Sequence, residues 1–526
     1  MVEEALTRVG VSVSELMHRA GLAASQEVMR LGQRGTVAIF VGLGNNGGDG
    51  WVAAEDLLGQ GMDVCVVSPV APEDLKGDLA RVVATSAQTA GVRIMVAPPR
   101  GDVEELLLTA SVIVDAMLGT GFRGEPRAPF DIWIDCINGA SAQVVSVDVP
   151  SGLSAQTGHA AGDCVIADVT VTMLTLKPGL LSDRGRDVCG SVVVAPLAEQ
   201  TEQLAVEADP VAWRVDLPDY LEVMEPPTAA VDKFTRGSVL VVAGSTRYPG
   251  AAMMAARAAA RAGAGYVTLA VPSPIVPTVQ AHMMEIPVIA MPSNVDGTFS
   301  SEAVDLAGKL AKSYSAVLVG PGMRVTSGTS GVVGALIESN VPLVIDADGL
   351  NCLSRLTSNQ LDDFPEMLRR TSPVILTPHH GELGRMVGLQ DNPPDSLTAA
   401  LEAARRIVWA EGGSELTVVA KGSATACVSV EIALLPKPGP STLATAGSGD
   451  VLSGIITALL AGSNARQQDL PLLAALACEI HGYAAALAAE RYGSRGVMAG
   501  DIIEAIGVAR DALEEHASYP EEQQDE

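Results

Sequence analysis

The chain has 526 residues, of which 34 are Lys or Arg and 62 are Asp or Glu, so its formal net charge at pH 7 is −28. At about 150 residues per domain, this length predicts two to four folding units. The acidic balance argues against a nucleic-acid-binding surface and against binding to anionic membranes, because both need clustered positive charge. Hydrophobic residues make up 48% of the chain, which excludes wholesale disorder.

The cysteines and the N-terminal sequence indicate an intracellular protein. The seven cysteines form no C-x-x-C pair and are odd in number, which argues against a disulfide framework and a zinc site. The segment MVEEALTRVGVSVSELMHRAG has no basic stretch followed by an apolar core, unlike a secretory signal. The most apolar helical stretches, around 251–271 and 451–462, contain Arg257 and Arg261 or are too short to cross a bilayer. We therefore expect buried helices there, no membrane partner and a cytoplasmic location.

Short β-branched runs alternate with helical stretches along most of the chain. In the first half, the predicted strands are 36–41, 63–68, 111–115, 143–149, 168–173 and 191–195. In the second half, they are 239–243, 266–271, 287–291, 316–319, 343–345 and 374–376. This alternation predicts an α/β protein whose parallel sheets are covered by helices on both faces.

The sequence changes character between Ala198 and Lys233. This segment is acidic, lacks sustained periodicity and contains Pro226-Pro227, so we interpret it as a linker and the edge of a second domain. The predicted domains are residues 1–210 and 225–515. Residues 516–526 form an acidic tail, which we expect to be solvated.

A glycine-rich loop follows the first predicted strand. Gly42, Gly44 and Gly47 satisfy G-x-G-x-x-G between a strand and a helix, which is the context of a dinucleotide-binding fingerprint. The second strand ends without the acidic residue that a dehydrogenase would use to hold a ribose hydroxyl. Asn45, Asn46 and Asp49 are concentrated in the turn, although ordinary turn chemistry also explains Asn-Gly and Asp-Gly pairs.

Two further strand ends carry a carboxylate beside a glycine or proline turn. Asp115 ends one predicted strand, and Asp148 ends the next and leads into Pro150-Ser151-Gly152. Ligands of open parallel sheets bind outside the carboxyl ends of the strands, so these residues are candidates for a site. Either residue could instead be a helix N-cap.

The first half resembles the NAD(P)H-hydrate epimerase family through GLGNNGGDG (42–50), VDAMLGTGFRG (114–124), VDVPSGL (147–153) and LKPGLL (176–181). The resemblance implies a Rossmann-like three-layer sandwich and a potassium ion bound by Asn46, Asp115 and Ser151. Asp148 would contact the substrate, and we expect it to shuttle the proton while water is lost and regained. Lys177 is a further candidate, or else a surface lysine. The other substrate-binding residues implied are Asn45, Asn46, Gly47, Gly48, Asp49, Gly119, Thr120, Gly121, Phe122, Arg123, Gly124 and Glu125.

The second half contains a different candidate for anion binding. Its only Gly-Lys pair, Gly308-Lys309, is followed by Leu310, which excludes a P-loop NTPase. Gly447-Ser448-Gly449-Asp450 opens a long apolar helix, where backbone N–H groups can face an anion and Asp450 can accept a proton. An ordinary helix N-cap would give the same short motif.

The order of TPHHGE (377–382), KGSAT (421–425) and GSGDVLSGII (447–456) resembles the ribokinase-like superfamily and, within it, the ADP-dependent NAD(P)H-hydrate dehydratases. This implies a ribokinase-like α/β/α domain that uses ADP and Mg²⁺, with Asp450 as the catalytic base. His380 is less probable as a ligand than its neighbour, and Ala446 stands where the family usually has glycine. Asp346 and Asp348 are candidates to hold Mg²⁺ through water, or strand-end caps. The implied contacts are Ala251, Gly322 and His379 for the hydrate, and Lys421, Gly422, Ser423, Ala424, Thr425, Gly447, Ser448 and Gly449 for the nucleotide.

The leading hypothesis is a two-domain enzyme that repairs hydrated NADH and NADPH. The first domain would interconvert the R and S hydrates, and the second would dehydrate the S form with ADP, giving AMP and phosphate. The expected partners are these small molecules, with no nucleic acid, and the resemblance also implies a homo-oligomer. Two alternatives are a ribokinase-like vitamin or sugar kinase fused to a nucleotide-binding domain, and a non-catalytic nucleotide-binding or scaffolding protein.

Overall fold

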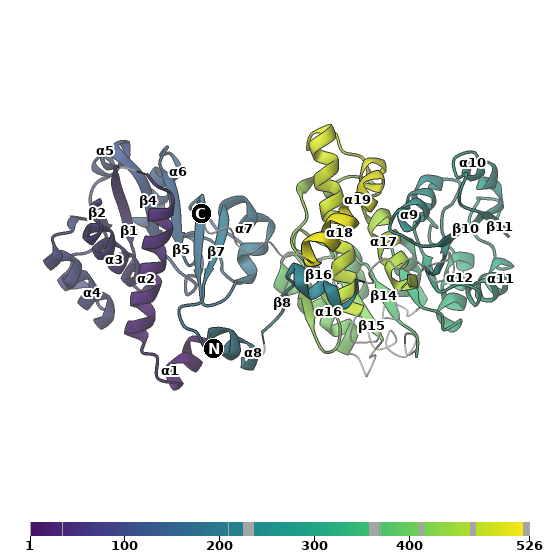
Figure 1. The fold of residues 1–526 in the computed structure, drawn as a ribbon, viewed down its shortest axis with the longest axis horizontal. Coiled ribbons are helices and arrows are strands. Elements are labelled where there is room, and N and C mark those ends of the chain that lie inside the picture. Colours follow the sequence, from purple (N-terminus) through teal and green to yellow (C-terminus); the bar gives the residue numbers. More distant parts are fainter. Residues whose placement is uncertain are drawn as a thin grey trace. The chain divides into compact units, whose positions relative to one another are not determined.

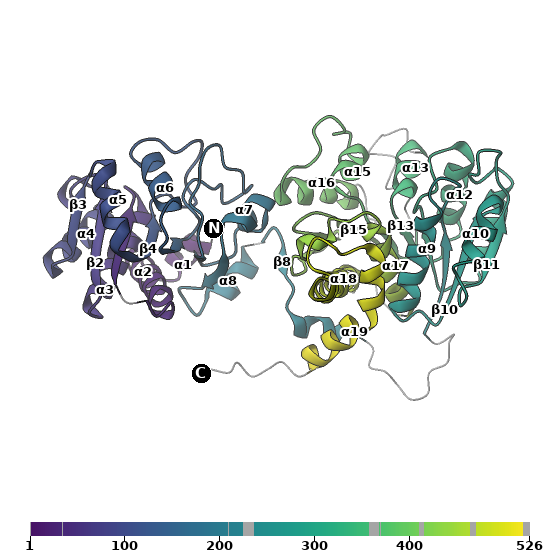
Figure 2. The same cartoon turned by 90° about the horizontal axis from the view of Figure 1, so that it is seen from above.

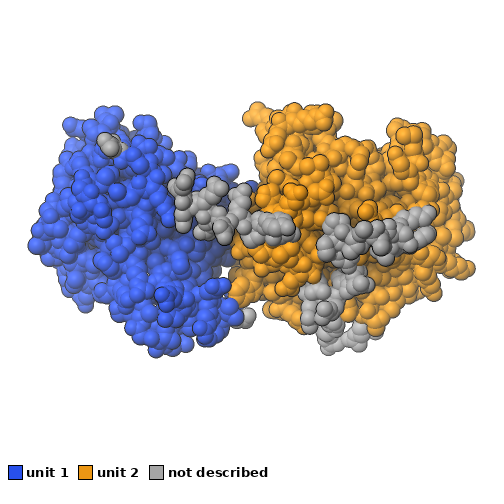
Figure 3. All heavy atoms as spheres, in the orientation of Figure 1, with its two compact units in different colours: residues 1–210 blue, residues 211–526 orange. Residues whose placement is uncertain are grey.

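The structure is a computed structural model that describes residues 2–33, 35–208, 210–224, 236–356, 368, 370–409, 415–462 and 470–518. The chain forms two compact units, Met1–Pro210 and Val211–Glu526, which Figure 3 shows in separate colours. Each unit contains its own sheet, and each is described by itself.

The first unit is built on a seven-stranded sheet whose neighbouring strands are all parallel. Because the central strands are buried on both faces, they consist of continuous β-branched and apolar residues. Across the sheet the order is β3 (Arg93–Val96), β2 (Asp63–Ser68), β1 (Thr36–Val41), β4 (Ala110–Ala116), β5 (Gln143–Val147), β6 (Val169–Met173) and β7 (Ser191–Ala195).

Helices cover both faces of this sheet (Figures 1 and 2). Alternate residues of β1 point to opposite faces, as the two-residue period of a strand requires. Val37, Ile39 and Val41 pack in one core cluster, while Ala38 and Phe40 pack in another. The helices are α1 (Val2–Arg8), α2 (Val13–Arg30), α3 (Asn45–Gly59), α4 (Asp78–Ala90), α5 (Arg100–Thr109), α6 (Phe130–Asn138), α7 (Asp183–Val188) and α8 (Thr201–Glu207).

The second unit contains a ten-stranded sheet. Its strands run parallel except at β16, which is antiparallel to both neighbours, so the expectation of wholly parallel sheets is wrong here. The reason is local, since a tight turn at residues 421–425 joins β15 directly to β16. The order is β11 (Val288–Met291), β10 (Tyr266–Pro272), β9 (Ser238–Val242), β12 (Ala316–Val319), β13 (Leu343–Ile345), β14 (Val374–Leu376), β15 (Leu416–Ala420), β16 (Ala426–Val428), β17 (Ala433–Leu435) and β8 (Trp213–Arg214).

Two layers of helices accompany this sheet. The helices are α9 (Pro249–Arg261), α10 (Val276–Gln280), α11 (Ala303–Ala311), α12 (Ser327–Glu338), α13 (Asp348–Leu356), α15 (His380–Met386), α16 (Leu397–Trp409), α17 (Ser448–Gly462), α18 (Leu470–Tyr492) and α19 (Ala499–Ser518). α9, α17, α18 and α19 share one large core cluster. In the other group, α11 packs against α12, α12 against α13, α13 against α15, and α15 against α16.

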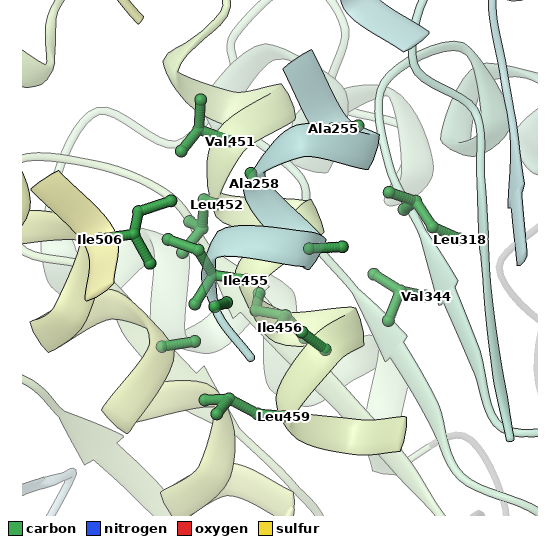
Figure 4. Packing of buried hydrophobic residues seen from close by; sticks show 14 of the residues in the cluster. Ala255, Ala258, Leu318, Val344, Val451, Leu452, Ile455, Ile456, Leu459 and Ile506 are labelled. Atoms are coloured by element: carbon green, nitrogen blue, oxygen red, sulfur yellow. The ribbon is translucent and has the colours of Figure 1, made fainter. Parts of the chain in front are cut away.

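The alanine-rich helix α9 packs closely against α17. A methyl group on Gly454 of α17 would lie only 2.4 Å from the carbonyl oxygen of Ala255. Figure 4 shows buried side chains of both helices in this core, among them Ala255 and Ala258 of α9 and Ile455 and Ile456 of α17. α9 ends at Arg261 and β10 begins at Tyr266, so residues 251–271 are a helix and a strand, not one buried helix.

Within the described residues, one helix is long and apolar enough by composition to cross a membrane, namely α18. In its most apolar window, 61% of the residues are buried inside the structure, and many belong to the core cluster of the second unit. The sequence analysis did not single out this helix. It lies beside α17 in Figures 1 and 2.

The described part of the segment between the predicted domains contains regular secondary structure. It contains α8, the strand β8, which pairs with β17, and a 3-10 helix, η3 (Leu217–Glu222), whose Tyr220 is fully buried. Residues 211–224 therefore belong to the second unit. Pro226-Pro227 lies outside the described residues, as does 519–526 of the predicted tail, and α19 continues to Ser518.

Candidate active sites

The first site begins at the N-terminus of α3, which opens with the Asn-Asn-Gly-Gly-Asp sequence. The N–H of Gly48 donates to the carbonyl of Gly44. The backbone N–H groups of Asn45, Asn46 and Gly47 have no hydrogen-bond acceptor among the described residues. These groups and the helix dipole make this end of α3 suitable for an anion.

The glycines of this loop have two different roles. A methyl group on Gly42 would lie 1.8 Å from the carbonyl oxygen of Met117, and one on Gly47 would lie 2.1 Å from that of Gly42. Both glycines are therefore required for close backbone packing. Gly44 has nothing within 4 Å of such a methyl group, so it borders open space, as close approach to a ligand requires. Close packing at Gly42 and Gly47 and open space at Gly44 are the roles that the dinucleotide-binding fingerprint gives its three glycines.

Asp115 lies at the end of β4 and is fully buried. Its carboxylate accepts hydrogen bonds from Ser151 Oγ at 2.5 Å, Ser151 N at 2.8 Å and Ser146 Oγ at 2.9 Å. Ser151 Oγ also accepts from the N–H of Leu118 at 2.8 Å. Burial raises the pKa of Asp115, and the hydrogen bonds from Ser151 oppose this shift. These contacts fasten together the loops that follow β4 and β5.

Asn46 completes this cluster. Both its amide nitrogen and its amide oxygen are buried, and neither has a hydrogen-bond partner. A methyl group on Gly119, next to Leu118, would lie 3.1 Å from Cβ and 3.3 Å from Oδ1 of Asn46. A buried amide without partners is costly unless a ligand satisfies it. The oxygens of Asn46, Asp115 and Ser151 suit a hard cation, and the described residues contain no group of three His, Cys, Asp or Glu side chains arranged for a metal.

Asp148 follows β5 in a left-handed conformation, with φ of 69°, which is unusual for a residue other than glycine. Its carboxylate accepts hydrogen bonds from Lys177 Nζ at 2.6 Å and from the N–H of Met173 at 3.3 Å. The side chain of Lys177 is only 16% exposed, so the surface-lysine interpretation is wrong. The strained backbone is typical of residues that the fold holds in place for function.

Asp49, on α3, is a second carboxyl group near Asp148. Burial, and then the negative charge of Asp148, raise the pKa of Asp49 well above its ordinary value. In the part of the chain that the structure describes, no hydrogen bond is made to the Asp49 carboxyl group. The two carboxyl groups thus have contrasting surroundings, because Asp148 is paired with the ammonium group of Lys177 and Asp49 has no such partner among the described residues. Such a contrast separates an acid from a base.

The loop Gly119–Glu125 borders a pocket of about 340 Å³. Phe122, Arg123 and Gly124 of this loop line it. The guanidinium of Arg123 donates to the carbonyls of Thr120 and Phe122, which keeps the loop compact. Sequence reasoning missed the other lining residues, which come from the glycine of the Pro-Ser-Gly turn and the chain that follows it, namely Gly152, Ser154, Gln156, Thr157, His159 and Ala161.

The second site centres on Lys421, at the end of β15. Its ammonium group lies 2.9 Å from Asp346 Oδ1, which also accepts a hydrogen bond from Thr377 Oγ1 at 2.7 Å. Burial opposes the charged form of Lys421, but the carboxylates of Asp346, Glu382 and Asp450 outweigh it and raise its pKa. The Asp346 side chain is 1% exposed, so its role here is to pair with Lys421 and not to face a hydrated metal.

Asp450 lies in the first turn of α17. Burial, and then the negative charge of Asp346, raise the pKa of Asp450 to about 7, while Lys421 opposes this shift. Among the described residues, no acceptor is found for the backbone N–H groups of Gly449 and Asp450. A poised carboxylate and an anion-binding helix end therefore lie together.

His379 caps α15 and forms a capping box with Glu382. Its ring Nδ1 accepts from the N–H of Gly381 at 3.0 Å, and its backbone N–H donates to the Glu382 carboxylate at 2.9 Å. Burial, and then the charge of Lys421, lower the pKa of His379, which favours the neutral ring. The side chain remains 57% exposed, so capping leaves room for a ligand contact.

The remaining predicted contacts also gather at this edge of the sheet. A methyl group on Gly322 would lie 3.0 Å from Cβ of Ala251, so these two residues are neighbours. Residues 421–425 form the tight turn between β15 and β16, where Thr425 Oγ1 donates to the carbonyl of Gly422. A methyl group on Gly422 would lie 2.5 Å from His380 Nε2, so His380 packs on this turn. Asp348 accepts a hydrogen bond from the N–H of Arg324.

Both units match known families. Residues 13–179 match the family described as YjeF-related protein N-terminus, and residues 239–507 match the one described as NAD(P)H-hydrate dehydratase. A bifunctional NAD(P)H-hydrate repair enzyme from Moorella thermoacetica is 35% identical over 95% of this chain and 93% of its own length. The bifunctional repair enzyme of Leishmania braziliensis is 33% identical over 94% of this chain and 89% of its own.

The chain belongs to the family of bifunctional NAD(P)H-hydrate repair enzymes. Matches in one chain to both domains support this assignment over a ribokinase-like kinase fused to a nucleotide-binding domain. Among solved structures, the ADP/ATP-dependent NAD(P)H-hydrate dehydratase of Bacillus subtilis, co-crystallised with ATP and Mg²⁺, is 24% identical with a TM-score of 0.46. It aligns over 57% of this chain and 99% of its own.

Two details of this repair-enzyme family member concern the helix end at Asp450. Ala446, which replaces the usual glycine, is exposed, so its methyl group points away from the packed part of the turn. His481 of α18 lies with Nε2 3.2 Å from Ser448 Oγ, and both side chains are buried. Sequence reasoning missed His481, because a lone histidine in an apolar helix gives no signal of the turn that it faces.

Proposed function

We propose that the first unit epimerises the R and S hydrates of NADH and NADPH at C6. The second unit then dehydrates the S hydrate with ADP, giving AMP and phosphate. The observation that carries this proposal is common to both sites. Each contains a half-buried carboxyl group, a lysine ion-paired to a carboxylate, and a helix N-terminus whose first N–H groups have no acceptor among the described residues.

For epimerisation, the substrate carries its C6 hydroxyl beside the ring nitrogen, so water can leave and return on either face. Asp49, whose raised pKa favours the protonated form, suits the role of proton donor to the departing hydroxyl. Asp148, paired with Lys177, suits the role of base for the incoming water. The free N–H groups of α3 and the loop Gly119–Glu125 would bind the diphosphate and the ring.

We further propose that Asn46, Asp115 and Ser151 hold a potassium ion. The support is the orphaned Asn46 amide beside two oxygen donors. When bound, the ion supplies positive charge that favours the ionised form of Asp115 and fixes the loops after β4 and β5. The residues themselves orient the substrate loop, because Leu118 is tied to Ser151.

For dehydration, Asp450 would remove the proton of the C6 hydroxyl, whose oxygen attacks the β-phosphoryl group of ADP as AMP departs. The N–H groups of Gly449 and Asp450 would stabilise the negative charge on the phosphoryl oxygens, with Lys421 close by. The C6–O bond then breaks as the ring nitrogen donates its lone pair, and loss of the C5 proton restores the dihydropyridine. Mg²⁺, when bound, would neutralise nucleotide oxygens. Of the two predicted carboxylates, Asp348 is the better candidate to hold it, because Asp348 is half-buried whereas Asp346 is 1% exposed and paired with Lys421.

The test is to incubate hydrated NADH or NADPH with the full chain and either ADP or ATP. We expect recovery of the reduced-nicotinamide absorbance, and more than half of a mixed R and S preparation should be converted, because epimerisation feeds the S form. No recovery with either nucleotide would overturn the proposal. The homo-oligomer and the cytoplasmic location stay predictions.

A further inference from the structure

The N-terminal turn of α17 is held from three other helices. Gly447 has φ of 88°, and a methyl group there would lie 2.5 Å from Met254 of α9 and 3.2 Å from Ala499 of α19. From α18, His481 Nε2 approaches Ser448 Oγ to 3.2 Å. Ser453 Oγ donates to the carbonyl of Asp450 from within α17, whereas the Ser448–His481 contact ties this turn to a different helix.

The histidine has no role in the chemistry proposed above. It is 5% exposed and Ser448 is 6% exposed, so neither side chain is open to solvent. A buried polar pair of this kind costs desolvation energy that an apolar pair would avoid, and one well-attested use of such pairs is to specify a single geometry.

We infer that His481 is a positioning residue for nucleotide binding, because it fixes the Ser448 hydroxyl and thereby the free N–H groups of Gly449 and Asp450. An anion-binding turn gains affinity when its donors need no rearrangement on binding. The inference rests on the proposed function, since it assumes that the anion is the diphosphate of an adenine nucleotide.

The surroundings keep the His481 side chain uncharged. Burial, and then the positive charge of Lys421, lower the pKa of His481 to about 3. A neutral imidazole can share one hydrogen bond with Ser448 at all working pH values, without adding a second cation beside Lys421. His481 therefore positions Ser448 through hydrogen-bond geometry and not through charge.

The test measures ADP affinity by calorimetry, together with KM and kcat for dehydration, on full-length variants. His481→Leu and Ser448→Ala should each weaken ADP binding about tenfold, the worth of one hydrogen bond, with a smaller change in kcat. His481→Gln, whose amide can still reach Ser448, should recover most of the affinity. The double variant should be no weaker than either single one, because both remove the same contact.

Leu473→Ala is the matched control, because Leu473 is also buried in α18 and lies about 12 Å along the helix from His481. It should lower Tm while ADP affinity stays within about twofold of the wild type. Wild-type ADP affinity in His481→Leu, or strictly additive losses in the double variant, would overturn the inference alone. Wild-type protein that binds ADP and fails to dehydrate would overturn the proposed function alone, and protein that binds no adenine nucleotide would overturn both.

Discussion

The ammonium group of Lys177 lies 2.6 Å from the carboxylate of Asp148, and both side chains are largely buried. Lys177 also donates to the carbonyl of Met173, so the lysine is fixed at two points. This pair joins the turn after β5 to the chain after β6. Lys177 thereby holds Asp148, the proposed base of the first site, in one orientation.

Lys177→Met should lower epimerisation of the hydrates about 10- to 100-fold, because Asp148 loses the group that orients it. The rate is measured by separating the R and S forms chromatographically over time. Dehydration of pure S hydrate in the same protein should be unchanged. Lys76→Met, at an exposed lysine of the same unit, is the control. Epimerisation at the wild-type rate in Lys177→Met would remove Lys177 from the site.

Asn46→Leu should abolish stabilisation of the first unit by potassium. In the absence of potassium its effect on Tm should be small, because the Asn46 amide makes no hydrogen bond that the substitution would break. The measurement is Tm in potassium chloride against Tm in a large organic cation. Asn138→Leu is the comparison, since Asn138 bonds Cys164 and Ile166 and its loss should cost about 1–3 kcal/mol in either salt. An equal potassium response in wild type and Asn46→Leu would contradict the cation site.

Asp450→Asn should reduce dehydration about 10²- to 10⁴-fold, the usual contribution of a general base, and leave epimerisation intact. Asp305→Asn, on α11, replaces an acidic residue away from the site and should keep both activities. Loss of both activities in Asp450→Asn, with normal Tm, would contradict the division of the chemistry between two sites.

The pH dependence of dehydration follows from the pKa of Asp450, which is about 7. Below that pH the carboxyl group is protonated and cannot act as a base, so kcat/KM should fall about tenfold per pH unit as the pH decreases and level off above about 7. Because Lys421 lowers the pKa of Asp450, Lys421→Met should move this decrease in kcat/KM to higher pH. If kcat/KM of Lys421→Met falls at the same pH as that of the wild type, Asp450 is not the titrating group.

Much of the fold is predictable from local patterns. The strands Thr36–Val41, Asp63–Ser68 and Ala316–Val319 have the predicted bounds, because continuous β-branched runs between turn residues specify buried parallel strands. β3 (Arg93–Val96) was missed, since it is an edge strand that begins with a charged residue and is only partly buried. β16 and β17 were missed because they follow β15 with no helix between them and so fall outside the strand–helix alternation on which the prediction rested.

The sequence by itself determined which residues lie at strand ends and helix starts, and so brought Asp115, Asp148 and Asp450 into consideration. Their chemistry was decided by tertiary structure, because protonation and hydrogen bonding depend on burial and on partners distant in the chain. Lys177 becomes part of the first site only because β5 and β6 are neighbours. His481 meets Ser448 only because α18 packs against α17. A one-dimensional pattern fixes local geometry, whereas these contacts arise when separate elements close over a common core.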